Sequence, residues 1–456
     1  MRTQEDFLNA AEAIVFDRDY RKKITDNIAK YDSAFQKGLH QYSNLELARE
    51  RAAFIKWKVI ENLDKYLIEF EASVVRRGGK VIWAHDVVTA QNEIEQIIKR
   101  TQAKTIVKSK TMVGEELQLN DFLRKKGLTV YETDLGEFIV DQAGEAPFHI
   151  VTPAMHKSRS DIAQLLNEKI GSSLDAEAEE LSNDVRNELR DKFLHADIGI
   201  TGANFLIADS GMVSITENEG NARLSFTFAK THIVLAGIEK VIPTINDLDL
   251  FYPMLATYGT GQKITAYNTI VGPRNADDDE ISGDFFVVLI DNGRSNLLAQ
   301  GEQRQALGCI KCGACLNVCP VFKNIGGHTY GSVYTGPVGS VTTPHTNGID
   351  EFKHLSFASP LCGKCTDVCP VKIDLHNHLV RNRRDIINAG TAKSGEKIMW
   401  FTWKKMMLSR NTLNKGNSVK NFMLKQFFKV SWGERRELPK LAEKSFNHLW
   451  RERFGQ

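Results

Sequence analysis

The sequence predicts an α/β protein with N-terminal helices, a largely parallel sheet and a mainly helical C-terminal part organised around cysteines. Three observations support this fold class. Apolar residues recur at helical spacing up to residue 75, strand and helix patterns alternate from Gly78 to about residue 297, and all seven cysteines lie between Cys309 and Cys369. The expected domains are residues 1–75 (helical segment), 76–297 (α/β domain), 298–390 (cysteine domain) and 391–456 (basic aromatic tail).

The overall composition is typical of a soluble globular protein. The chain has 456 residues, of which 42 % are hydrophobic and 25 % charged, and its formal net charge is +2. A charge balance so close to neutral gives no support for nucleic-acid binding. No apolar run approaches the ~18 residues of a membrane-spanning helix, and the N-terminus lacks the pattern of a secretory signal. We therefore expect a cytoplasmic protein with reduced cysteines, whose contact with the inner membrane is at most peripheral.

The N-terminal segment carries a helical pattern. From Asn44 to Arg77, apolar residues recur mostly at three- and four-residue intervals with charged residues between them. This spacing predicts an amphipathic helix or a pair of helices. We expect the apolar face to pack against the next domain.

From Gly78 the pattern changes to short strands separated by helices. The predicted strands are GGKVIWAHD, KTIVKSK and LTVYETD, and the predicted helices are TAQNEIEQIIKRTQ and TMVGEELQLNDFLRKKG. Thr111 is the expected N-cap of the second helix, and Gly127 suits the left-handed position beyond its end. Alternation with short links indicates βαβ units and a parallel sheet.

The same alternation continues to about residue 297. DIAQLLNEKI and AEELSNDVRNELRDKFLHA are predicted helices. The stretch from Ile198 to Phe226 is predicted to form strands joined by turns rich in glycine, asparagine and aspartate. THIVLAGIEKVIP and FFVVLIDNG are predicted as further strands, which complete the α/β domain.

The stretch CIKCGACLNVCP has the spacing C-x2-C-x2-C-x3-C-P, with thiols at Cys309, Cys312, Cys315 and Cys319. This is the ferredoxin run for a cubane iron–sulfur cluster. Two intervening residues let neighbouring thiolates reach adjacent irons from one tight loop. Gly313 lacks a Cβ, so the backbone of this loop can approach the sulfides closely.

A shorter run, CGKCTDVCP, contains the remaining cysteines. Aligned on the proline after Cys369, it matches the last three cysteines of the first run, and the missing one falls at Ser359. In two-cluster ferredoxins the cysteine before proline ligates the other cluster. The predicted ligands are Cys309, Cys312, Cys315 and Cys369 for cluster 1, and Cys319, Cys362 and Cys365 for cluster 2.

This assignment leaves cluster 2 one thiolate short. Ser359, another side chain or water could complete a [4Fe–4S] cluster, or cluster 2 is a [3Fe–4S] centre without a fourth iron. Zinc would favour four cysteines or mixtures with histidine, and it would not explain the spacing that ends in proline. A disulfide framework conflicts with seven cysteines and with a reducing compartment. We therefore expect two iron–sulfur clusters.

Such clusters pass one electron at a time. Oxidation of most organic substrates requires a flavin or a nicotinamide, and the sequence has neither a G-x-G-x-x-G fingerprint nor a P-loop. We therefore expect electron donor and acceptor proteins as partners, with a partner performing the first oxidation. No catalytic residue is predicted in this chain.

Polar side chains follow several of the predicted strands. They are Ser109, Lys110, Glu132, Thr133, Asp134, Glu137, Glu217, Asn218, Glu219, Asn221 and Arg223, with His149 and His156 beside the segment IVTPAM. Ligands of doubly wound sheets bind at the carboxyl ends of strands, so these residues are a candidate pocket. The alternative is that they form caps, turns and salt bridges. Between the cysteine runs, the glycine-rich insert with His328, Tyr330 and His345 is expected to wrap the clusters, and the alternative is that one of its histidines is a ligand or a proton carrier.

Several of these motifs together resemble the lactate utilization protein B family, the iron–sulfur subunit of a bacterial L-lactate oxidation system. They are VKSKTMVGEELQLNDFLRKKGLTVYETDLGEFIV, HIVTPAMHK, GITGANFLIADSGMVSITENEGN and the two cysteine runs. The resemblance implies a lactate-utilization domain similar to the NagB/RpiA/CoA-transferase fold, followed by a ferredoxin domain with two [4Fe–4S] clusters. In APFHI, Phe148 stands where the family leads us to expect a small polar residue.

The resemblance also implies a role and partners. The role is electron transport during oxidation of L-lactate to pyruvate. The partners are two sister subunits, one with cysteine-rich repeats and one a shorter homologue of the α/β domain. The wide spacer between the cysteine runs is similar to that of the helical ferredoxin domain in succinate dehydrogenase and fumarate reductase subunits.

Two other functions remain open beside this electron-transfer role. The first is an oxidoreductase whose α/β domain binds its own substrate or nucleotide, and the second is an iron–sulfur redox sensor or scaffold.

The tail mixes Trp400 and Trp403 with lysines such as Lys404 and Lys405. We expect a protein interface or internal packing there, and the alternative is a membrane surface.

Overall fold

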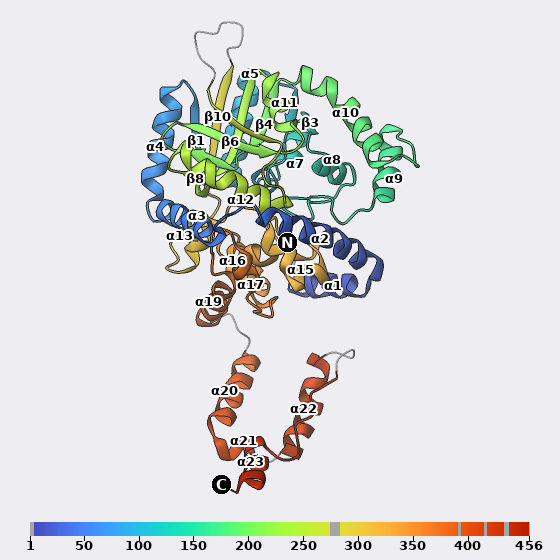
Figure 1. Cartoon of the computed structure of the whole chain (residues 1–456), viewed down its shortest axis with the longest axis vertical. Coiled ribbons are helices and arrows are strands. Elements are labelled where there is room, and N and C mark those ends of the chain that lie inside the picture. Colours follow the sequence, from blue (N-terminus) through green and yellow to red (C-terminus); the bar gives the residue numbers. More distant parts are fainter. Residues whose placement is uncertain (1–3, 274–282, 391–393, 415–416, 433–436, 456) are drawn as a thin grey trace. The chain divides into compact units, whose positions relative to one another are not determined.

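The computed structural model describes residues 4–273, 283–390, 394–414, 417–432 and 437–455 (Figure 1). It divides into two compact units, Met1–Asp385 and Ile386–Gln456. The larger unit contains the N-terminal helices, the sheets and all the cysteines.

The N-terminal segment is helical, as the periodicity predicts. Its helices are α1 (Gln4–Phe16), α2 (Arg18–Leu39), α3 (Leu45–Ile60) and α4 (Leu63–Arg76). The side chains of Asp17 and Asn44 cap α2 and α3, each accepting a backbone N–H at 2.9 Å. The stretch from Asn44 to Arg77 is therefore a pair of helices, one of the two arrangements predicted.

The described residues form a six-stranded parallel sheet in the order β1-β10-β7-β4-β2-β3, which confirms the predicted fold class. The strands are β1 (Lys80–Ala84), β2 (Thr105–Lys108), β3 (Thr129–Glu132), β4 (Ile198–Gly202), β7 (Thr231–Gly237) and β10 (Asp284–Ile290). After β3 at one edge, the chain returns to the other side of β2 to form β4. This reversal of strand order is where doubly wound sheets bind ligands.

Helices and a smaller sheet accompany the parallel sheet (Figure 1). The helices are α5 (Val87–Thr101), α8 (Leu135–Gln142), α9 (Arg159–Ile170), α10 (Ala178–His195) and α12 (Leu248–Thr260), with the short turn η2 (Ile245–Asp247). The second sheet has the order β8-β5-β6-β9, from β5 (Phe205–Ile207), β6 (Met212–Glu217), β8 (Val241–Ile242) and β9 (Tyr267–Val271).

The prediction of one helix in TMVGEELQLNDFLRKKG is wrong. The segment forms α6 (Met112–Glu116) and α7 (Leu119–Lys125), and Gln118 between them has a φ of +47°. A left-handed residue cannot continue a right-handed helix. Thr111 precedes α6 as predicted, but its side chain makes no capping hydrogen bond. Gly127 has the predicted left-handed conformation, with a φ of +79°.

Two segments predicted as strands differ in the structure, where each includes a helix or a helical turn. The end of the stretch from Ile198 to Phe226 becomes α11 (Asn221–Thr227), because the carboxylate of Glu217 accepts the N–H groups of Ala222 and Arg223 at 2.7 and 3.0 Å. THIVLAGIEKVIP is divided into β7 and β8 by the short turn η1 (Ile238–Lys240), so its two halves belong to different sheets.

The cysteine region is mainly helical, as predicted. Its elements are α13 (Arg294–Leu298), η3 (Gln303–Gly308), α14 (Ala314–Val318), α15 (Pro320–Ile325), η4 (His328–Tyr330), α16 (Gly336–Thr346), α17 (Ile349–Phe357), α18 (Lys364–Val368) and α19 (Leu375–Asn388). Helix α15 packs against α1 and α2 (Figure 1). One apolar cluster includes Phe7, Ile24 and Phe322, so the N-terminal helices share a core with the cysteine region.

A buried ion network joins three elements of the larger unit. The Arg294 guanidinium donates to both carboxylate oxygens of Glu116, at 2.7 and 2.9 Å, and to Glu239 at 2.5 Å. Burial raises the pKa of Glu239, but the charges of Arg294, Lys311 and Lys240 together outweigh it and lower the pKa to about 2. The hydroxyl of Tyr334 also donates to Glu116. The network therefore connects α6, η1 and α13 to the spacer between the cysteine runs.

Close packing of β4 against α11 gives a testable prediction. A Cβ at Gly199 would lie 2.0 Å from the carbonyl oxygen of Ser225, a backbone atom that cannot move independently. We expect Gly199→Ala to reduce stability by about 2–3 kcal/mol, measured as a lower thermal midpoint. Gly301→Ala is the control, because no atom lies within 4 Å of its Cβ position. Equal midpoints for the two variants would contradict this packing argument.

The smaller unit is helical. Its helices are α20 (Ser394–Leu408), α21 (Arg410–Asn414), α22 (Asn417–Trp432) and α23 (Phe446–Phe454). Trp400 and Trp403 are exposed, and their rings meet edge to face at 5.6 Å. The predicted use of this tail as an interface stays a prediction. No described helix is both long enough and apolar enough to span a membrane.

Candidate metal centre and adjoining pocket

The two cysteine loops have the same backbone conformation. Lys311 and Leu361, each directly before a cysteine, have φ values of +61° and +56°. Gly313 and Gly363, each directly after that cysteine, have φ values of +80° and +81° and begin the short helices α14 and α18. These helices pack against each other. The shared conformation supports the repeat that the spacing indicated.

One group of thiols is centred on Cys315. Burial raises its pKa well above the usual range, and the charges of neighbouring cysteines raise it further. These neighbours are Cys309, Cys312, Cys369 and Cys365. Burial likewise raises the pKa of Cys369 to about 12, with a further contribution from Cys309. The structure thus brings Cys369, from the second loop, next to the first three cysteines of the first loop.

A second group contains the remaining thiols. Burial raises the pKa of Cys365 to about 11, and the charges of Cys319 and Cys362 raise it further. The pKa of Cys319 is also raised by burial and by Cys362. Cys362 is exposed, whereas Cys365 and Cys319 are buried. This grouping matches the crossed arrangement expected for two clusters, with Cys365 and Cys315 adjacent across the two groups.

The residues present fit iron–sulfur clusters. None of the seven cysteines is in a disulfide, and buried thiols are suitable ligands for a soft metal once deprotonated. Backbone N–H groups point at the sulfurs: Lys311 donates to Cys309 and Ile373 to Cys369, both at 3.3 Å. Such hydrogen bonds stabilise thiolates and are one of the factors that set cluster potentials.

Basic side chains surround the first group of thiols. The Lys56 ammonium is buried and donates to the carbonyl of Glu239 at 2.7 Å. Burial lowers the pKa of Lys56 and of Lys240 to about 8, and the charge of Cys309 opposes this in both cases. The Arg49 guanidinium donates to the carbonyl of Cys369 at 2.9 Å. Positive charge is therefore concentrated around this group.

His149, which follows α8 in the chain, packs against Gly313 of the first cysteine loop. Its Nδ1 accepts the N–H groups of Val151 and Thr152, at 3.0 and 3.2 Å. Burial and the charge of Lys110 lower its pKa to about 3, so the ring is neutral near pH 7. A Cβ at Gly313 would lie 2.9 Å from Cε1 of this ring. The missing side chain of Gly313 thus makes room for His149, a contact between distant segments that spacing alone did not indicate.

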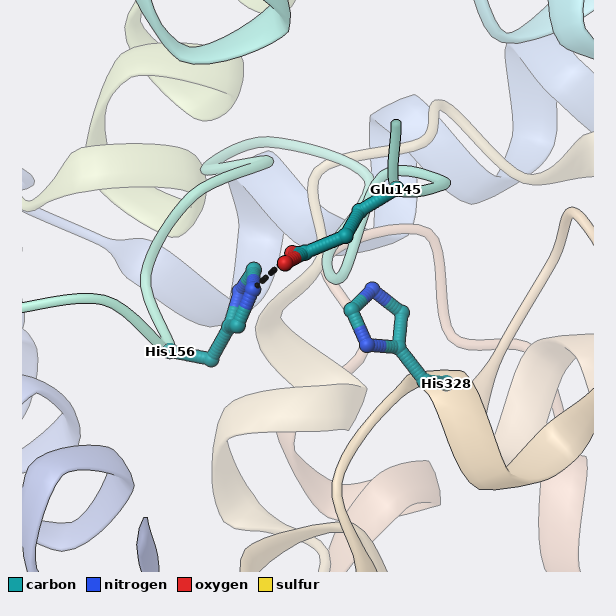
Figure 2. A group of neighbouring side chains, drawn as sticks. All are labelled: Glu145, His156 and His328. Atoms are coloured by element: carbon teal, nitrogen blue, oxygen red, sulfur yellow. Dashed lines mark hydrogen bonds and ion pairs between the residues drawn. The ribbon is translucent and has the colours of Figure 1, made fainter. Parts of the chain in front are cut away.

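His156 and His328 lie close to each other and to Glu145 (Figure 2). His156 Nε2 lies 2.7 Å from the carboxylate of Glu145, and the ring centroids of the two histidines are 4.8 Å apart. Lys157 donates to the same carboxylate at 2.7 Å, and His328 Nε2 lies 2.7 Å from the carbonyl of Ala146. These contacts join the loop after α8 to the spacer, and the wrapping of the clusters by the spacer stays a prediction.

The other spacer residues and Phe148 have packing contacts. Tyr330 is buried against Phe7 and Phe322, and His345 Nε2 lies 2.9 Å from the side chain of Asn382. Phe148 is fully buried and stacks on His156 with centroids 5.0 Å apart. The small polar residue expected at position 148 is replaced by an aromatic ring, which belongs to the same apolar cluster as Phe322 of the cysteine region.

A pocket of about 370 Å³ lies at the reversal of strand order between β2 and β4. Seven of the polar residues predicted from the strand ends line it: Ser109, Lys110, Asp134, Glu217, Asn218, Glu219 and Asn221. Several also act as caps, since Asp134 accepts the N–H of Glu137 at 3.0 Å and Glu219 that of Leu135 at 3.0 Å. These residues therefore form caps and also line a cavity, and the binding of a ligand there stays a prediction.

The pocket is not lined by four of the predicted strand-end residues: Glu132, Thr133, Glu137 and Arg223. The carboxylates of Glu132 and Glu137 are buried around the ammonium of Lys108, which lies 2.6 Å from Glu132. Burial lowers the pKa of Lys108, but the charges of Glu132, Glu115 and Glu137 outweigh it, so the pKa is raised. This group is an internal ion cluster separate from the pocket.

The wall of the pocket also includes Cys312 and Lys311 from the first cysteine loop, together with Lys240 from η1. Sequence reasoning missed Lys240. The sequence feature that could have indicated Lys240 as a pocket residue is the polar pair Glu239–Lys240 within the largely apolar run THIVLAGIEKVIP. Lys240 makes no hydrogen bond or ion pair to other described residues, so its ammonium is available to a ligand in the pocket.

Comparison with known proteins gives matches over most of the chain. Residues 67–290 match the family model described as LUD domain, and residues 305–373 match the model described as 4Fe-4S dicluster domain. Proteins named lactate utilization protein B from Bacillus thuringiensis, Bacillus cereus and Bacillus anthracis are 42 % identical over 363 residues, which is 79 % of this chain and 76 % of each relative.

A solved structure, a DUF162 family protein from Deinococcus radiodurans, is 10 % identical. The alignment covers 50 % of this chain and 98 % of that one, with a TM-score of 0.28. That similarity is too low to carry a conclusion about fold.

Proposed function

The chain belongs to the lactate utilization protein B family, and we propose that it is the electron-transfer subunit of an L-lactate-oxidising complex, with two iron–sulfur clusters. The single observation that carries this proposal is the division of seven cysteines into two neighbouring groups, each drawing on both loops. An iron–sulfur cluster, when bound, supplies one-electron transfer.

The chain's own residues have distinct tasks in this proposal. Cys309, Cys312, Cys315 and Cys369 hold cluster 1, and Cys319, Cys362 and Cys365 hold cluster 2. The cations Lys56, Lys240 and Arg49 balance the charge of the first thiolate group, and positive charge nearby raises a cluster's reduction potential. The exposed Cys362 places the second group at the surface, where a redox partner can approach.

The oxidation of L-lactate requires partner proteins that carry out the two-electron step. Oxidation of L-lactate to pyruvate releases two electrons and two protons, and one-electron centres need a flavin or nicotinamide carrier to take up a hydride. We therefore propose that sister subunits of the lactate utilization system oxidise lactate and deliver single electrons to this chain. These are a protein with cysteine-rich repeats and a shorter α/β homologue.

Anaerobic purification with iron and sulfide analysis tests this function. We expect about eight irons per chain, the same amount of sulfide, and EPR signals that appear on reduction with dithionite. The sister subunits together with L-lactate should also reduce the protein. Zinc without iron, or clusters that these subunits cannot reduce, would contradict the proposal.

The pocket favours a second candidate, a domain that binds the carboxylate substrate itself. Lys110, Lys240 and Lys311 line the same cavity as Cys312, so a small carboxylate bound there would lie beside cluster 1. Calorimetric titration with L-lactate and with pyruvate tests this candidate. Lys240→Gln should weaken binding by about tenfold or more, whereas the exposed Lys230→Gln should not. If neither L-lactate nor pyruvate binds to the wild type, the second candidate is rejected and electron transfer remains as the proposed function.

A further inference from the structure

The two cysteine loops correspond residue by residue at a constant offset. Cys312, Cys315 and Cys319 of the first loop match Cys362, Cys365 and Cys369 of the second. At the remaining ligand position, Cys309 of the first loop corresponds to Ser359 of the second. The question is therefore whether the hydroxyl of Ser359 occupies the place of the fourth thiolate.

Backbone conformation around Ser359 follows that around Cys309. Two residues after each of them, the chain turns through a left-handed residue, Lys311 in one loop and Leu361 in the other, with φ values of +61° and +56°. Neither lysine nor leucine favours this conformation, so the surrounding structure imposes it. The same unusual turn in both loops means that the two positions are presented to their clusters in the same way.

The side-chain atoms at these positions also have the same hydrogen bond. The N–H of Lys311 donates to Sγ of Cys309 at 3.3 Å, and the N–H of Leu361 donates to Oγ of Ser359 at 3.1 Å. The hydroxyl oxygen of Ser359 therefore stands in the position of a ligand sulfur. Its backbone is held by α19, since Arg383 donates to the carbonyl of Ser359 at 2.8 Å. This positive charge favours an anionic oxygen at the same residue.

We propose that Oγ of Ser359 is the fourth protein ligand of cluster 2, which makes it a four-iron cluster with three sulfur ligands and one oxygen ligand from the protein. This assignment rests on the proposed function, because it presumes that Cys319, Cys362 and Cys365 hold a cluster. On coordination the hydroxyl would release its proton to solvent, which reaches the partly exposed Ser359. As an alkoxide, the serine oxygen would be a harder donor than a thiolate and would give its iron a different electronic environment from the other three.

Spectroscopy of three variants tests the assignment. The full chain is purified anaerobically as wild type, Ser359→Ala, Ser359→Cys and the control Ser332→Ala, whose hydroxyl donates to the carbonyl of Tyr334 in the spacer. Iron and sulfide analysis is combined with EPR of the oxidised and reduced states and with Mössbauer spectra. The midpoint potential of each cluster is measured by redox titration.

The expected results separate the variants clearly. Wild type and Ser332→Ala should hold about eight irons, with one iron site distinct in the Mössbauer spectrum. Ser359→Ala should hold about seven and show the EPR signal of an oxidised three-iron centre. Ser359→Cys should hold about eight, lose the distinct iron site, and shift the midpoint potential of cluster 2 while that of cluster 1 stays the same.

Two outcomes would overturn the assignment while leaving the electron-transfer function intact. One is a Ser359→Ala protein whose iron content and spectra equal those of the wild type. The other is a wild-type protein that already contains a three-iron centre under strict anaerobic conditions. Absence of iron from the wild type and from Ser359→Cys alike would contradict the proposed function, and the assignment with it. The Ser359→Cys spectrum keeps the test decisive even where Ser359→Ala fails to fold, because a distinct iron site that persists unchanged in Ser359→Cys would also overturn the assignment.

Discussion

Replacing Cys369 by alanine is expected to remove cluster 1, although Cys369 lies in the second cysteine loop. Burial raises the pKa of this thiol and that of Cys315. The charge of Cys309 adds to the shift of Cys369, and the charge of Cys369 adds to that of Cys315, so the neighbours of Cys369 belong to the first loop. We expect loss of about half of the iron and of the EPR signal of cluster 1. Electron transfer from the lactate-oxidising subunits should fall to background.

The matched control is Cys365→Ala, only four residues earlier in the same loop. Its thiol is adjacent to Cys319 and Cys362, so its loss should remove cluster 2 and leave the signal of cluster 1. The two variants should therefore lose different clusters, distinguishable by midpoint potential. If both variants lose the same cluster, each loop holds its own cluster and the crossed assignment is wrong.

The second large effect is expected at Arg294. Arg294→Met removes the cation that pairs with Glu116 and Glu239. It leaves the Glu116 carboxylate without its paired cation and the buried Glu239 carboxylate with only the charges of neighbouring lysines such as Lys311 and Lys240. Breaking a buried ion pair by removing one partner costs about 3–5 kcal/mol. We expect a strongly lowered thermal midpoint or little soluble protein, because the network joins the α/β domain to the cysteine region.

Lys80→Met provides the comparison for Arg294→Met. The Lys80 ammonium pairs with Asp284 at 3.0 Å, but both side chains are substantially exposed. Exposed pairs contribute about 0–1 kcal/mol. The midpoint of Lys80→Met should therefore stay close to that of the wild type. Similar midpoints for the two variants would show that the Arg294 network contributes no more than a surface pair.

The features that the sequence predicted well are local. The parallel sheet is indicated by alternation between neighbouring elements, and the structure confirms it. The cluster ligands are indicated by spacing within short loops, and they stay a prediction. Even the crossed grouping follows from a general rule about the cysteine before proline. The wrong predictions come from backbone conformations that the residue types do not favour or reveal. Gln118 adopts a left-handed conformation that glutamine does not favour, and this ends α6. The carboxylate of Glu217 caps the next segment, which therefore forms α11 instead of the expected strand.

The features that were missed depend on contacts between distant segments. Lys240 looks like part of a strand, and only the division between β7 and β8 brings it to the pocket beside Cys312. His149 was singled out for its position beside a strand, but its contact with Gly313 joins residues more than a hundred positions apart. Nothing in the sequence indicated a reason for an aromatic residue at position 148. The reason is contact with distant residues, because the ring of Phe148 packs against those of His156 and Phe322.

The shared core of the N-terminal helices and the cysteine region has a consequence for biosynthesis. Phe7 and Ile24 pack in one cluster with Phe322, and Arg49 bonds the carbonyl of Cys369. The ribosome therefore releases the first helices long before their binding surface exists, while the α/β segment between them can already fold. Contacts at such long sequence separation form late. We expect the cysteine loops to remain open to iron-delivering proteins until the N-terminal helices close over them as the last step of maturation.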